Sequence, residues 1–149
     1  MEYTIRNAVP SDVEELVHLC AEHAEYERAA FDPAGKREGL MKYLFAEQPR
    51  FHCLMAENEE GILGYASFTF EFSTWDACLF THMDCLYLRP DYRGFGIGEA
   101  LVNEIVKQSR THNVTLMQWH TPDFNERAIK FYRRIGATSK DKVRFYLNL

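Results

Sequence analysis

The segment with the clearest chemical meaning is a run of glycines at alternating positions, Arg93-Gly94-Phe95-Gly96-Ile97-Gly98. Glycine has no side chain to hold a ligand away from the backbone, and it adopts positive φ readily, so successive N–H groups can point toward one place. A predicted helix follows the segment and adds the positive end of its dipole. The segment therefore predicts a seat for an anion, of which phosphate is the first candidate.

Two common phosphate-binding loops are excluded by the spacing. A dinucleotide-binding fingerprint needs glycines at its first, third and sixth positions, but the sixth position counted from Gly94 is Glu99. A nucleoside triphosphate loop ends in Gly-Lys-Ser or Gly-Lys-Thr, which the segment lacks. A glycine-rich turn without any ligand is the plain alternative.

Hydrophobic periodicity predicts the elements that position this loop. Ser11 and Glu14 have the spacing of a capping box at the start of a helix, and Gly136 is placed to end the last helix in a left-handed conformation. The predicted order is βααβββαβαβ, an α/β (α+β) fold with a mixed central sheet and helices packed on it. Strands are expected at 3–7, 51–57, 62–72, 79–88, 114–120 and 143–149, and helices at 11–26, about 40–48, from 97 past 106, and 125–135.

Composition sets the outer limits. With 149 residues, 46% of them hydrophobic and 26% charged, the chain is sized for one globular domain spanning residues 1–149. The net charge of −5 argues against general affinity for nucleic acid or anionic membranes and suits a cationic substrate. The sequence lacks an apolar run of membrane-spanning length and a secretion signal at its start, which predicts a cytoplasmic protein. Cys20, Cys53, Cys78 and Cys85 lack metal-ligand spacing, so no metal is expected.

Four segments together resemble the GNAT acetyltransferase superfamily, and within it the diamine (spermidine/spermine) acetyltransferase group. The loop of that superfamily reads Arg/Gln-x-x-Gly-x-Gly/Ala, and Arg93, Gly96 and Gly98 occupy those places. The fold that the resemblance implies has two parallel central strands that splay apart. The similar segments are 22–27, 51–57, 91–98 and 125–132.

The resemblance implies acetyl-CoA as co-substrate, held in the wedge between the splayed strands 81–88 and 114–120. The backbone of Leu86, Tyr87 and Leu88 would pair with the pantetheine arm, and the N–H groups from Gly94 to Glu99 would hold the pyrophosphate. Asn125 would steady the cofactor arm, with Glu126, Arg127 and Ala128 nearby. Leu86 and Leu88 also read as ordinary core residues.

The same resemblance implies Tyr132 as the general acid. The leaving thiolate has a conjugate acid of pKa about 8.5, and a tyrosine of pKa about 10 can protonate it as charge develops. An alkyl ammonium of pKa about 10.4 must first lose a proton, which a carboxylate can accept. Glu27 and Asp84 are the candidates, although Asp84 stands where the group usually carries glutamate. Packing of an aromatic ring and a solvated acidic helix face are the structural alternatives.

The acceptor side is less defined. Tyr26 and Glu27 match the group's substrate-contacting pair, and Gln118, Trp119 and His120 are expected to face the substrate. The chain lacks a tryptophan that the animal polyamine enzymes carry near the amine, and its loop at 58–61 is shorter. The expected acceptor is a small cationic amine: a polyamine, a diamine or a lysine-like amino acid such as thialysine. The alternatives are a protein or antibiotic amine and a non-catalytic CoA sensor, and the resemblance also implies a homodimer.

Overall fold

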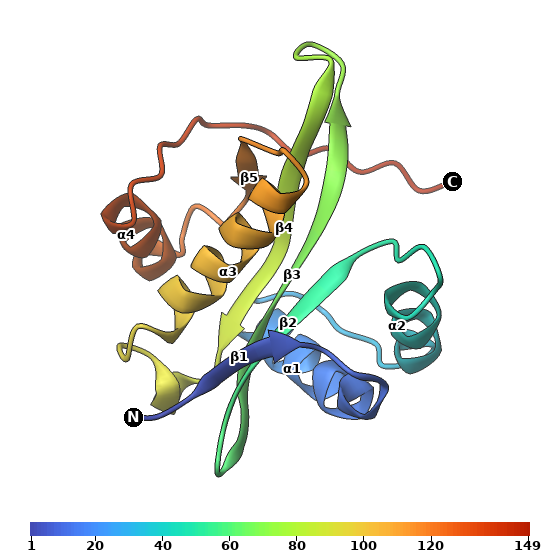
Figure 1. The fold of residues 1–149 in the computed structure, drawn as a ribbon, viewed down its shortest axis with the longest axis vertical. Coiled ribbons are helices and arrows are strands. Elements are labelled where there is room, and N and C mark those ends of the chain that lie inside the picture. The colour runs from blue at the N-terminus through green and yellow to red at the C-terminus, as the bar shows by residue number, and fades with distance from the viewer.

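A five-stranded sheet forms the centre of the computed structural model, which describes residues 1–149. Its strands lie in sequence order, with β1 to β4 antiparallel and β5 parallel to β4. Helices cover both faces, α1 and α2 on one and α3 and α4 on the other (Figure 1). The predicted fold class is confirmed. The strands are β1 (Thr4–Asn7), β2 (His52–Asn58), β3 (Gly61–Ser73), β4 (Cys78–Leu88) and β5 (Met117–Trp119), and the α-helices are α1 (Val13–Tyr26), α2 (Lys36–Leu44), α3 (Ile97–Thr111) and α4 (Glu126–Arg134).

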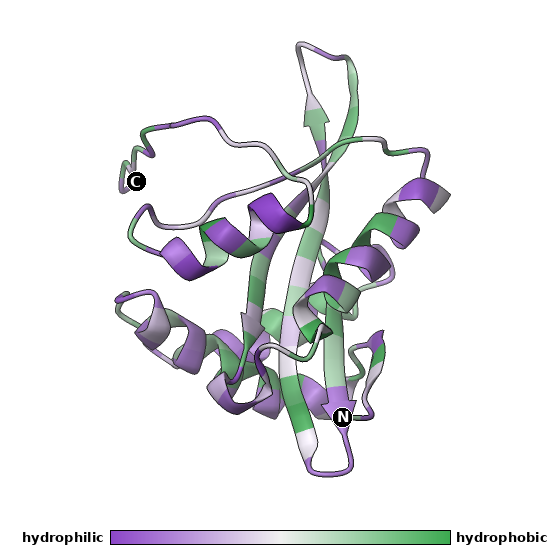
Figure 2. Ribbon diagram, turned by 90° about the vertical axis from the view of Figure 1, so that its left-hand side faces the viewer, coloured by the Kyte–Doolittle hydropathy of each residue, from purple (hydrophilic) through white to green (hydrophobic).

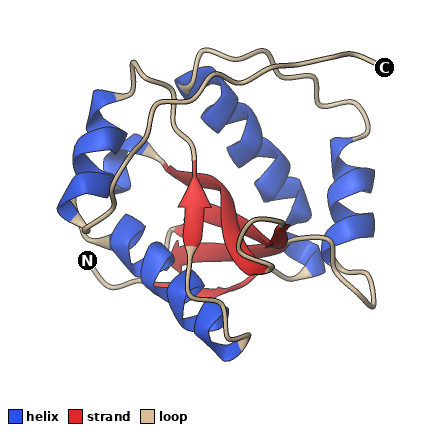
Figure 3. Ribbon diagram, turned by 90° about the horizontal axis from the view of Figure 1, so that it is seen from above, coloured by secondary structure: helices blue, strands red, loops and turns tan.

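Both faces of the central strands are buried, and this explains why they read as almost continuous apolar runs. On β2, Leu54 and Ala56 belong to the core beneath α3, whereas Cys53 and Met55 belong to the core beneath α1 and α2. Because side chains alternate along a strand, one apolar segment supplies both cores. In Figure 2 the strands are largely green to white, whereas the helices alternate between purple and green residues, and the view from above in Figure 3 shows helices around the sheet.

The prediction for the start of the first helix is wrong in its detail. Ser11 is exposed and lies in a short 3₁₀ turn, Pro10–Asp12, that precedes α1. The backbone N–H of Val9 donates to the carboxylate of Asp12 at 2.8 Å, and Arg6 donates to both oxygens of that carboxylate. Arg6 holds the pKa of Asp12 below its ordinary value. Asp12, held by β1, therefore fixes the helix start in place of the Ser11–Glu14 pair.

The last predicted strand, 143–149, is absent. Its residues form no strand, and the side chains of Val143, Phe145, Leu147 and Leu149 are largely exposed. Alternating apolar residues favour a strand, but a strand forms only where another strand's edge pairs with it. The segment pairs with no edge of this sheet, so β5 is an edge strand rather than a central one.

Candidate functional site

A cleft of about 940 Å³ opens where β4 and β5 part. The two strands pair only between Thr81–Met83 and Met117–Trp119. Beyond that point β4 keeps its other neighbour, β3, as far as Leu88, but its edge toward β5 is unpaired. Asp84, Cys85, Leu86, Tyr87 and Leu88 all line the cleft. The splay therefore leaves backbone N–H and C=O groups facing a cavity, where an extended ligand can pair with them as a further strand would.

The glycine loop forms one end of the cleft. Gly94 and Gly96 have φ of +90° and +82°, the left-handed region that glycine adopts at little cost, and Gly96 is the N-terminal cap residue of α3. Gly98 already lies in the helix and, with Glu99, lines the cleft. Phe95 and Ile97 do not line it: Phe95 is exposed and Ile97 is buried in the core. Any contribution of these two residues to a ligand would come from their main-chain N–H groups.

Several basic side chains line the cleft. Arg93, Arg127, Lys130 and Arg134 line the cleft, together with the acidic Glu99 and Glu126. The Nε of Arg93 donates to the carbonyl oxygen of Leu88 at 2.8 Å, and its guanidinium lies 4.4 Å from the ring centroid of Tyr26. Four basic side chains in one cleft, which also holds the N-terminus of α3, favour a polyanionic ligand.

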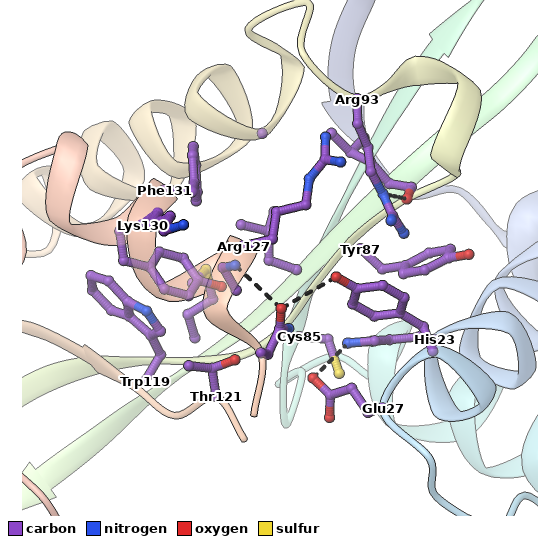
Figure 4. A pocket seen from close by; sticks show the side chains of 18 of the residues that line it. His23, Glu27, Cys85, Tyr87, Arg93, Trp119, Thr121, Arg127, Lys130 and Phe131 are labelled. Atoms are coloured by element: carbon purple, nitrogen blue, oxygen red, sulfur yellow. Dashed lines mark hydrogen bonds and ion pairs between the residues drawn. The ribbon is translucent and has the colours of Figure 1, made fainter. Parts of the chain in front are cut away.

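Asn125 connects the two walls of the cleft. Its side-chain oxygen caps α4 by accepting the N–H of Ala128 at 3.2 Å, and it also accepts the hydroxyl of Tyr26, from the end of α1, at 3.2 Å. Figure 4 shows side chains that line the cleft, among them Glu27, Arg93 and Trp119. The cap explains where α4 begins, since an Asn oxygen satisfies an N–H group that the first helical turn leaves free. Asn125, Tyr26 and Ala128 thus all line the cleft.

Tyr132 lines the cleft from α4, with its ring against the edge of Trp119 at a centroid distance of 5.1 Å. Burial raises the pKa of its hydroxyl above the ordinary value, and the negative charge of Glu27 raises it further. The phenol is therefore protonated at neutral pH. A protonated hydroxyl in a half-buried position can donate a proton to a group that becomes anionic beside it.

Glu27 faces the same cleft from the C-terminal end of α1, and a hydrogen-bonded chain holds its carboxylate in place. His23, one helical turn earlier, has Nε2 3.2 Å from the carboxylate and Nδ1 3.1 Å from the hydroxyl of Tyr65. Because a carboxylate only accepts, Nε2 of His23 carries the proton, and Nδ1 accepts from Tyr65 when the ring is neutral. Burial lowers the pKa of His23, which favours that neutral ring.

Asp84 owes its direction to an irregularity in the sheet. Ser67 of β3 pairs with Cys85 and Phe68 pairs with Met83, so Asp84 lies between them without a partner on β3. Such a bulge turns the strand and redirects its side chains. The carboxylate is 65% exposed and lies 3.8 Å from Nε2 of His82. Asp84 is therefore a solvated acid at the cleft wall.

Of the three residues expected on the acceptor side of β5, two line the cleft. Trp119 packs against Tyr132, and His120 follows directly, its ring 5.6 Å from that of His82. Gln118 is exposed, pairs with His82 in the sheet and does not line the cleft.

Several cleft residues escaped the sequence reasoning. His23, Cys85, Thr121, Lys130 and Arg134 received no role, yet all line the cleft. The spacing of His23 and Glu27, four residues apart on one helix, was a usable signal, because such pairs are neighbours on a helix surface. Cys85 gave none, since its position follows from the bulge at Asp84. The acidic run of α1 divides: Glu22, with Glu15, binds Arg89, whereas Glu27 faces the cleft.

Comparison with known proteins identifies the family of this chain. The model of the acetyltransferase (GNAT) family matches residues 14–137. The chain belongs to the GNAT acetyltransferase family. A thialysine N-ε-acetyltransferase of Bos taurus is 30% identical over 141 residues, which cover 89% of this chain and 82% of that protein. A human spermidine/spermine N(1)-acetyltransferase-like protein is 25% identical over 91% of this chain and 20% of its own length.

Solved GNAT-like structures agree in fold. An integron cassette protein from the mobile metagenome of V. cholerae has a TM-score of 0.79 and 25% identity, covering 99% of this chain and 94% of its own. A possible acetyltransferase from Clostridium difficile has a TM-score of 0.83 at 20% identity, covering 100% and 99%. The chain is thus a GNAT N-acetyltransferase, and members of this family use acetyl-CoA as co-substrate.

Two further observations describe what the fold contains. None of the helices combines the length and apolar composition that a membrane span requires. No three His, Cys, Asp or Glu side chains are arranged to hold a metal ion.

Proposed function

We propose that this GNAT enzyme acetylates a small cationic amine, such as a polyamine, a diamine or a lysine-like amino acid, by direct attack of the amine on acetyl-CoA. The observation that carries the proposal is that Tyr132 and the carboxylates of Glu27 and Asp84 face one cleft, beside the open edge of β4. The thialysine acetyltransferases among the relatives support an acceptor of this size and charge.

The cleft has the features that acetyl-CoA requires. The unpaired edge at Leu86–Leu88 suits the amide groups of the pantetheine arm, while the N–H groups between Gly94 and Glu99 and the nearby arginines suit the pyrophosphate. When bound, this co-substrate supplies an acetyl group activated as a thioester. Asn125, at the start of α4, is placed to hydrogen-bond the arm in exchange for its contact with Tyr26.

The two ends of the reaction need opposite proton transfers: the ammonium nitrogen loses two protons, the second after its bond to the acetyl carbon forms and the bond from that carbon to sulfur breaks, and the sulfur gains one. The second proton restores the phenol of Tyr132 through solvent, and the proton on Glu27 is released to water. Glu27, held by His23, attracts the ammonium form of the acceptor and takes its proton directly or through a water. Asp84 adds a second negative charge on the other wall. Tyr132, whose raised pKa keeps its hydroxyl protonated, donates its proton to the departing sulfur. The net result is an acetylated amine and the free thiol.

The test is thiol release from acetyl-CoA by the purified protein, with spermidine, putrescine, thialysine and lysine added separately. Release with any of these amines, and its absence without an acceptor, supports the proposal. Release with none of them, while acetyl-CoA binds, would refute the small-amine acceptor and favour a protein or antibiotic amine or a CoA sensor. Glu27→Gln should lower kcat/KM for the amine and leave acetyl-CoA binding unchanged.

We also propose that the protein forms a homodimer. It is supported by the exposed apolar side chains of residues 143–149 and by the unpaired edge of β5, because exposed alternating strands and sheet edges favour pairing with another chain. The mass of the protein in solution, measured by light scattering coupled to gel filtration, tests whether it is a dimer. A mass of one chain at micromolar concentration would contradict it.

A further inference from the structure

A second cavity, of about 370 Å³, lies on the α1 and α2 face of the sheet and meets the cleft at Asp84 and Cys85, which line both. It is lined by alternate residues of β3, Ser67, Thr69 and the exposed Glu71, and by His82 and Asp84 of β4. Apolar side chains of α1, α2 and β2 close its sides, among them Leu16, Leu40 and Phe51. An acceptor that reacts beside Asp84 can therefore extend from the cleft into this cavity.

The charges of the second cavity have one sign. Glu71 and Asp84 are its two carboxylates, and neither a lysine nor an arginine lines it. The chain thus offers a cation two anionic partners there, whereas a carboxylate would find neither a lysine nor an arginine. Electrostatic matching of this kind selects between ligands of equal length.

The sheet register sets the length of the acceptor. Glu71 pairs with Phe80, four residues before Asp84 on β4. At about 3.3 Å per residue, the two acidic positions are roughly 13 Å apart along the strand. A short diamine spans only part of that distance, whereas a longer amine can place one nitrogen in the cleft and another near Glu71.

We propose that this second cavity is the subsite for the far end of the acceptor and that Glu71 is its specificity-determining residue. The subsite selects a second ammonium group many methylenes from the first and rejects a carboxylate. The proposal rests on the amine acetylation proposed above. It predicts that the preferred acceptors are long diamines or polyamines rather than amino acids.

The test compares three acceptors of equal length: diaminooctane, octylamine and aminooctanoic acid, whose far ends are cationic, neutral and anionic. The wild-type kcat/KM should be highest for diaminooctane and lowest for aminooctanoic acid, and diaminooctane should exceed diaminobutane. Glu71→Gln should lower the value for diaminooctane about fivefold, the scale of one solvated charge pair, and leave octylamine within twofold. Glu59→Gln, an exposed acid in the β2–β3 turn, is the matched control and should change none of the values.

Equal losses with octylamine and diaminooctane in Glu71→Gln, or a wild type that does not distinguish the three far ends, would overturn the subsite. If none of the amines releases thiol, the proposed function fails, and calorimetric titration of diaminooctane onto the wild type and onto Glu71→Gln decides the subsite separately. Binding that weakens in the variant supports it. A wild type that gives no binding heat overturns it.

Discussion

Replacing Tyr132 by phenylalanine removes one hydroxyl and keeps the ring. The ring makes the packing contacts, edge-on to Trp119 at 5.1 Å and tilted against Phe131 at 5.2 Å. Phenylalanine preserves both contacts, so the free energy of unfolding should change by no more than about 1 kcal/mol, the scale of a single hydrogen-bonding group. The change therefore separates a chemical role of Tyr132 from a packing role.

The expected kinetic effect is large by comparison. The raised pKa of Tyr132 keeps its proton available at every pH of interest, and removing a general acid costs about 10² to 10⁴ in rate. At about 1.36 kcal/mol for each factor of ten, the lower limit is about 2.7 kcal/mol of lost transition-state stabilisation. The loss should fall on kcat, with the affinity for acetyl-CoA within about twofold of the wild type.

The assay follows thiol release at saturating acetyl-CoA, with cofactor affinity measured by calorimetry and folding by thermal denaturation. Tyr92→Phe is the control, because the hydroxyl of Tyr92 bonds Glu60 outside the cleft. If Tyr132→Phe kept more than about a third of the wild-type kcat, or lost activity only together with stability, the assignment of Tyr132 as the proton donor would be refuted.

Three other changes test different parts of the structure. Because burial raises the pKa of Tyr132, its phenol stays protonated and kcat/KM should show no descending limb up to about pH 9; a descending limb near pH 8 would contradict this. Gly64→Ala should lower the free energy of unfolding by about 2 kcal/mol in denaturant titrations, because its Cβ would lie 2.2 Å from the carbonyl oxygen of Tyr87; unchanged stability would refute the close approach. Gly96→Val forces φ of +82° on a β-branched residue, so acetyl-CoA affinity should fall about tenfold in calorimetry, whereas unaltered affinity would exclude the loop as the phosphate seat.

Local patterns predicted most of the secondary structure. The strands β2 to β4 and the helices α1 and α4 agree with the expected ranges to within a few residues, because apolar periodicity and glycine positions act over a few residues at a time. Helix α3 begins at the expected residue and continues to Thr111. Gly136 has φ of +96°, as expected of a residue that ends a helix. The segment at 143–149 failed because its pattern depends on an edge that another part of the fold must provide.

The candidate site likewise contains features that local sequence predicts and features that only the tertiary structure creates. The glycine loop, Asn125 at the start of α4 and the acidic end of α1 are local features, so the sequence identified them before any three-dimensional information. Other features depend on strand register and on helix packing across the sheet. These are the lack of a β3 partner for Asp84, the hydrogen-bonded chain from Tyr65 through His23 to Glu27, and the second cavity lined by Glu71. The sequence by itself predicted the family, its co-substrate and the segments proposed to hold it, since these predictions rest on contiguous motifs. Only the tertiary structure decided which carboxylates share a cleft and where the second cavity meets it, because a single bulged residue in β4 changes which side chains face that cavity.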